Sequence, residues 1–147
     1  MVVVSCKNKE SIHQDSSQPV GVETDFIKKM QGSWRLVGSG TNWGYRDLSL
    51  EETEELITIK KNEISYFERD KSDGTKSLIS RENIFLYHGS IGHLYPIKWV
   101  TKDKIIIVFE FDSDENLLFR QLGELSEDGT EMEQVCGNHT MIYERIR

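Results

Sequence analysis

Short segments of apolar and β-branched residues alternate with polar turn sequences along most of the chain. From residue 32 onward, the apolar segments end at clusters of Gly, Asn, Asp and Ser, such as Ser72-Asp73-Gly74 and Glu127-Asp128-Gly129. This spacing is typical of antiparallel β proteins. We predict strands at residues 33–39, 56–60, 63–69, 76–87, 93–100, 104–111 and 117–125, and a final strand or pair of strands within residues 131–146.

The connections between these segments are short, and short connections favour pairing between strands that follow one another in the chain. The result is an up-and-down meander. Closing about eight strands into a barrel removes the exposed edges and leaves an interior wide enough for side chains or for one small ligand. The sequence therefore predicts an all-β fold, an up-and-down eight-stranded antiparallel β-barrel.

Two short helices are also predicted. Residues 24–30 begin with a Thr that can cap a helix and carry apolar side chains at Phe26, Ile27 and Met30. Ser49 precedes Glu52 with the spacing of a capping box, which predicts a helical turn at residues 49–52. The chain contains no alanine and fourteen isoleucines, a composition that favours strands over long helices.

The first 22 residues differ from the rest of the chain. Val2-Val3-Val4-Ser5-Cys6 resembles the lipobox that ends a bacterial lipoprotein signal, in which the cysteine is lipidated and becomes the first residue of the mature protein. Only five residues precede Cys6, so this would be the end of a longer signal. The alternative is an ordinary tail that contains a cysteine. Residues 7–22 are polar and are predicted to form a flexible linker before a domain at 23–147.

The tripeptide Gly32-Ser33-Trp34, with a short helix before it, resembles the start of a lipocalin-type barrel of the calycin superfamily. That resemblance implies a tryptophan, Trp34, at the closed end of the barrel, with an arginine of the last strand packed across its ring. Arg145 is the best match, with Arg147 and Arg120 as alternatives. The Thr-Asp-Tyr motif of that family is absent. The family implies binding of small apolar molecules, and the lipobox implies a membrane-anchored lipoprotein of the bacterial cell envelope, facing the periplasm or the surface.

The charge and composition of the chain limit the classes of molecule that it could bind. The net charge of −7 and the scattered lysines leave no basic face for nucleic acid. Aromatic residues on the predicted strands, together with one arginine, would form a pocket for a small apolar ligand. The opposite interpretation is that the same side chains fill the barrel as an ordinary core. The predicted ligand-binding residues are Trp43, Tyr45, Tyr66, Phe85, Tyr87, Trp99, Phe109 and Arg120.

Trp43 and Tyr45 lie in a Gly-rich segment, residues 38–46, and two interpretations of them stay open. They form either a lid over the open end of the barrel or a surface for contact with another protein.

The sequence gives little support for catalysis or metal binding. Cys136 and His139 form a single Cys-x-x-His pair, whereas a zinc site needs three or four ligands. The glutamates of residues 51–55 are interpreted as a solvated helix surface. The nucleophile-elbow, phosphate-loop and His-Glu-x-x-His motifs are absent. We therefore predict a non-enzyme without metal or cofactor.

Three functions remain, in order of preference. The first is a lipocalin-like binding protein for a small hydrophobic or amphipathic ligand, with a lipid anchor on Cys6. The second is a protein-binding module, an inhibitor or an immunity-type partner, with a filled barrel. The third is an enzyme that uses Arg120 or a histidine in the barrel mouth. The oligomeric state is not predicted. An interior void below about 100 Å³ would exclude the first function, because ligand pockets usually measure about 300–1,000 Å³.

Overall fold

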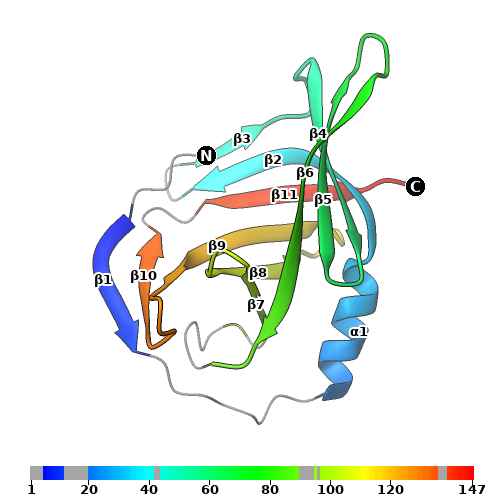
Figure 1. Cartoon of the computed structure of the whole chain (residues 1–147). Helices are drawn as coiled ribbons and strands as arrows, with labels where there is room; N and C mark the ends of the chain where they lie inside the picture. The colour runs from blue at the N-terminus through cyan, green and yellow to red at the C-terminus, as the bar shows by residue number, and fades with distance from the viewer. Residues whose placement is uncertain (1–4, 12–19, 42–43, 90–94, 96, 136–138) are drawn as a thin grey trace.

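The computed structural model describes residues 5–11, 20–41, 44–89, 95, 97–135 and 139–147 (Figure 1). One helix and eleven strands lie in this part of the chain. In chain order they are β1 (Ser5–Ser11), α1 (Val20–Met30), β2 (Gly32–Thr41), β3 (Gly44–Asp47), β4 (Thr53–Lys60), β5 (Glu63–Asp70), β6 (Lys76–Tyr87), β7 (Lys98–Thr101), β8 (Ile105–Phe111), β9 (Leu117–Leu125), β10 (Glu131–Val135) and β11 (Thr140–Arg145).

Eight of these strands form a closed antiparallel barrel. β2, β4, β5, β6, β7, β8 and β9 pair in chain order, β9 pairs with β11, and β11 returns to pair with β2. Arg145 lies opposite Trp34, and Met141 lies opposite Ser39 in this closing pair. The predicted up-and-down eight-stranded barrel with a short N-terminal helix is confirmed, and the helix covers the end of the barrel at which β2 begins (Figure 1).

Two strands were not predicted. β1 occupies residues assigned to the linker and pairs antiparallel with β10, which in turn extends the far half of β9. Its residues, Ser-Cys-Lys-Asn-Lys-Glu-Ser, are polar, so backbone pairing along β10 forms this strand without an apolar pattern that a sequence would reveal. β3 lies in the Gly-rich segment and pairs with the far half of β2. The domain boundary at residue 23 stays a prediction.

The helical turn predicted at residues 49–52 is wrong. Asp47 explains the difference, because its carboxylate accepts hydrogen bonds from the Ser49 backbone N–H at 2.8 Å and from the Ser49 hydroxyl at 2.7 Å. This Asx turn occupies the hydroxyl that would have capped a helix. The segment after β3 is therefore a non-helical loop, and Leu48 within it is tied to the barrel by a 2.9 Å hydrogen bond from its N–H to the Val37 carbonyl.

The half of the barrel next to α1 is filled with apolar side chains. Trp34 and Met30 are completely buried there, and the other buried members of this cluster are Leu36, Ile57, Ile59, Ile64, Ile84, Ile97, Trp99, Ile107, Phe109, Leu117 and Tyr143. Burial of this apolar surface is the main favourable term in folding. The aromatic interior therefore acts as a core in this half of the barrel.

Arg145 and Trp34 fasten the helix to the closed end. The Arg145 guanidinium carbon lies 4.1 Å from the centre of the Trp34 ring. The same guanidinium donates to the Gln31 carbonyl at 2.8 Å and to the Lys29 carbonyl, while the Trp34 indole N–H donates to the Met30 carbonyl at 3.0 Å. Carbonyls at the C-terminal end of a helix lack hydrogen-bond donors within the helix. The side chains of Arg145 and Trp34 provide such donors here. The expected packing of an arginine of the last strand on the tryptophan is confirmed.

We predict that Arg145→Lys destabilises the protein by about 1–3 kcal/mol, because an ammonium keeps the charge but cannot hold two carbonyls and stack on the indole with one planar group. Urea unfolding followed by tryptophan fluorescence measures the change. Arg147→Lys, two residues further along the exposed C-terminus, is the matched control. Equal unfolding midpoints for the two variants would contradict this role of Arg145.

Candidate functional site

Two adjoining cavities lie at the end of the barrel opposite α1. The larger, here the mouth cavity, has a volume of about 740 Å³, and the smaller, here the side cavity, has a volume of about 350 Å³. Both are lined by Glu55 and Glu68, which form the wall between them. The mouth cavity is lined by Leu36, Ser39, Arg46, Leu48, Leu50, Glu51, Glu52, Thr53, Glu55, Glu68 and Met141, and the side cavity by Glu55, Leu56, Ile57, Tyr66, Phe67, Glu68, Ile79, Ser80 and Tyr143.

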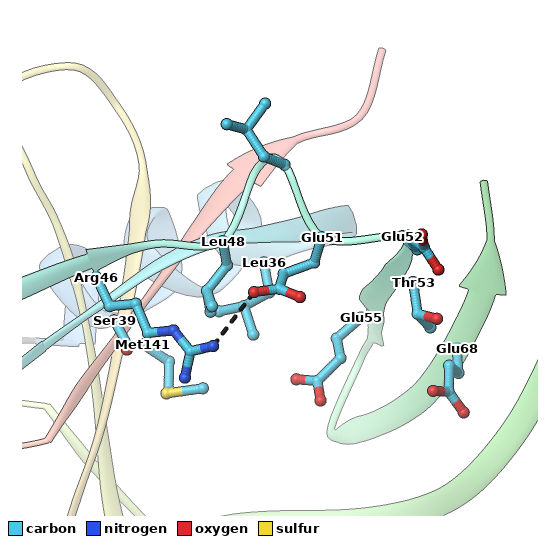
Figure 2. A pocket seen from close by; sticks show the side chains of 11 residues that line it. Leu36, Ser39, Arg46, Leu48, Glu51, Glu52, Thr53, Glu55, Glu68 and Met141 are labelled. Carbon is cyan, nitrogen blue, oxygen red and sulfur yellow. Dashed lines mark hydrogen bonds and ion pairs between the residues drawn. The ribbon is translucent and has the colours of Figure 1, made fainter.

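A β-bulge in β2 shapes the mouth cavity. Ile142 lies opposite Gly38, but the next residue, Tyr143, lies opposite Leu36, so Val37 is an extra residue in β2. The bulge shifts the alternation, and Leu36 and Ser39 therefore both line the cavity. The Val37 carbonyl accepts the Leu48 N–H, which places the Leu48 side chain on the cavity wall as well (Figure 2).

Strand alternation separates the acidic residues of β4. Glu54 is 8% exposed and forms ion pairs with Arg35 and Arg69 on the outer face. Burial acts to raise the pKa of Glu54, but hydrogen bonds and charge from Arg69 and Arg35 outweigh burial and lower that pKa below its usual range. The next residue, Glu55, points to the opposite face and lines the cavities.

Glu55 and Glu68 form an uncompensated like-charge pair. They lie directly opposite each other on β4 and β5, and both side chains face Arg46 and Met141 across the mouth cavity (Figure 2). Arg46 is hydrogen-bonded to Glu51 at 3.2 Å. Among the described residues, no lysine or arginine forms an ion pair with Glu55 or Glu68. Both side chains are exposed at the cavity rim, and like charges directly opposite each other weaken a sheet modestly.

Two tyrosines extend the polar wall into the side cavity. The Tyr66 hydroxyl donates to the Glu82 carboxylate at 3.0 Å. Burial raises the pKa of Tyr66, and the charge and hydrogen bond of Glu82 raise it further. Tyr143 is 6% exposed, and its pKa is raised by burial and then by the charge of Glu55. Both phenols are therefore neutral at physiological pH, beside a wall of negative charge.

The predicted ligand-binding residues divide between the two faces of the barrel. Tyr66 lines the side cavity. Trp99 and Phe109 also point inward, but both are buried in the packed core, where Phe109 contacts Phe119 with ring centres 5.1 Å apart. The filled-core interpretation therefore describes these two residues.

The other predicted residues lie away from both cavities. Phe85 is 51% exposed, and Arg120 is bonded to Glu110 and, at 2.8 Å, to the Thr140 hydroxyl. Tyr87 packs against a second, smaller core cluster of Ile106 and Met132. Tyr45 is 62% exposed, and its ring lies against Gly38, where it fills the place of a side chain. Trp43 lies outside the described residues.

Among the cavity residues that were not identified from the sequence are Glu55, Glu68, Leu48, Met141 and Tyr143. One signal in the sequence points to the two glutamates. Glu55 continues the inward face of Ile57 and Ile59, and Glu68 continues that of Ile64 and Tyr66. A charge in register with the apolar face of a strand marks a place where the interior becomes polar.

Metal and membrane features are absent from the described part of the chain. No group of three or more His, Cys, Asp or Glu side chains converges there as a metal site would require. His139 is described and exposed, whereas Cys136 lies outside the described residues. Within the same part of the chain, α1 is neither long nor apolar enough to cross a bilayer.

Comparisons with protein families, with curated proteins and with solved structures found no match to this chain.

We predict that Glu55→Gln stabilises the ligand-free protein by about 0.5 kcal/mol at low ionic strength, because it removes the cross-strand repulsion with Glu68. The gain should shrink in 1 M salt, where charges are screened over about 3 Å. Urea unfolding of Glu55→Gln, Glu68→Gln and the double variant measures the coupling, and Glu127→Gln in an exposed turn is the control. Fully additive effects in the double variant would show that the two carboxylates do not interact.

Proposed function

We propose that this protein is a lipocalin-like binding protein that holds a small amphipathic ligand in the mouth of its barrel. The single observation that supports this most strongly is the pair of adjoining cavities of about 740 and 350 Å³. Ligand pockets usually measure about 300–1,000 Å³. Both cavities are open to solvent, and their volumes lie within this range.

The lining of the cavities suits an amphipathic molecule better than a purely apolar one. Leu36, Leu48 and Met141 offer apolar contact on one side of the mouth cavity, and carboxylates stand on the other (Figure 2). A purely hydrocarbon ligand would displace water from these carboxylates without offering them a hydrogen bond, which is unfavourable in free energy. A ligand with one polar group and one apolar part matches both walls.

We further propose that the protein is a lipoprotein of the bacterial cell envelope, anchored through Cys6. The lipobox-like sequence supports this. Because β1 includes residue 6 and pairs with β10, an anchor at this position would hold the barrel directly at the membrane, without a long tether.

We predict that the neutral fluorescent probe N-phenyl-1-naphthylamine binds the purified full chain, and that Met141→Trp weakens this binding at least tenfold by filling the mouth cavity. Probe fluorescence measures binding, and thermal unfolding checks that each variant folds. Leu78→Trp, on an exposed position of β6, introduces the same ring outside the cavities and is the control.

Ser39→Trp fills the cavity from the neighbouring strand and replaces Met141→Trp if that variant does not fold. Probe binding that is unaffected by filling the cavity, or a probe that does not bind at all, would refute the proposed function.

A further inference from the structure

We infer that the ligand is a small primary amine with an apolar body, whose ammonium group is held by Glu55, Glu68 and the Tyr143 hydroxyl. The inference rests on the proposed function and specifies the ligand class of the same cavities.

Glu55 and Glu68 have no counter-ion among the described residues. Three arginines of the surrounding strands are already engaged, since Arg35 and Arg69 bind Glu54 on the outer face and Arg46 binds Glu51. Glu55 and Glu68 face each other across the β4–β5 pair and have no ion-pair partner among the described residues. A positive charge between them would replace repulsion with two attractions.

Tyr143 places a hydroxyl at the same cavity. Tyr143 is 6% exposed and lines the side cavity together with Glu55 and Glu68. Its hydroxyl has no hydrogen-bond partner among the residues that the structure describes. The hydroxyl oxygen is not among the buried polar atoms that lack a partner, so it opens onto the side cavity, where a ligand can reach it. A donor on a bound ligand would satisfy this oxygen, and it is independent of the acidic pair as a sign of a ligand.

The hydrogen-bond donors of a primary ammonium match the acceptors of this site in number. A primary ammonium carries three N–H donors, and two carboxylates and one phenol oxygen provide three acceptors. A quaternary ammonium has no donor to offer. A divalent metal ion is a poorer match, because it prefers six or more oxygen ligands, and no three metal-ligating side chains converge among the described residues.

The apolar part of the amine can pack against apolar side chains of the side cavity. Ile57, Tyr66 and Ile79 line the side cavity beside the two glutamates. Ile79 is 60% exposed, so its side chain is accessible to a ligand in this cavity. An alkyl or aryl chain attached to the ammonium would cover it.

The test is isothermal titration calorimetry of the full chain at pH 7 with hexylamine, hexanol, hexanoate and hexyltrimethylammonium, which share one apolar body. We expect hexylamine to bind at least tenfold more tightly than hexanol and than the quaternary ion, and hexanoate to bind most weakly. The Glu55→Gln/Glu68→Gln double variant should lose the preference for the amine and keep its affinity for hexanol. Glu127→Gln is the control with the same charge change in an exposed turn.

Tyr143→Phe tests the third acceptor, and it should weaken hexylamine severalfold while leaving hexanol unchanged. Nα-acetyl-lysine amide presents the same ammonium on a peptide, and tighter binding of this compound than of hexylamine would overturn the assignment to a small free amine. Equal affinities for hexylamine and the quaternary ion would overturn the three-acceptor arrangement.

The outcomes separate the two proposals. If N-phenyl-1-naphthylamine and hexanol bind in the cavities but the amine has no advantage, this inference fails and the proposed function stands. If neither the probe nor any hexyl compound binds, both fail.

Discussion

The antiparallel pairing of β11 with β2 is the constraint on which the other features depend. It closes the barrel, and closure gives every strand residue one of two environments, the interior or the outer face. On β4, this places Glu54 on the outer face, buried between two arginines, and turns the exposed Glu55 toward the cavities, where no ion pair to it is found among the described residues. The bulge at Val37 is the local exception, and it occurs in the same pair of strands. This one backbone irregularity brings both Leu36 and Ser39 to the wall of the mouth cavity.

The barrel is not uniform along its axis. Next to α1, Trp34, Ile59 and Ile64 fill the interior with almost no exposure, whereas at the opposite end glutamates and tyrosines replace aliphatic side chains. Apolar packing stabilises the fold, and polar groups that lack partners lower its stability. The packed half next to α1 therefore provides the stability that allows the other half to stay open and acidic.

Much of the fold could be predicted from the sequence, because turn residues and apolar alternation are local signals. The strands 76–87 and 117–125 match β6 and β9 at both ends, and Arg145 packs on Trp34 as expected. The site was harder to predict. Alternation shows that Phe85 and Tyr87 share a face but not which face points inward, and both lie outside. Glu55 was interpreted as part of a helix surface, because Ser49 has the spacing of a cap but bonds to Asp47 instead.

The contact between Arg145 and the end of α1 has a consequence for the order of folding. The guanidinium of Arg145 binds the carbonyls of residues that precede it by 114 and 116 positions. Contacts across such separations form late, because nearly the whole chain must be ordered to bring their ends together. During synthesis the chain grows from its N-terminus, so β11 must leave the ribosome before Arg145 can bind the end of α1. The closed end of the barrel is therefore completed only after β11 has been synthesised.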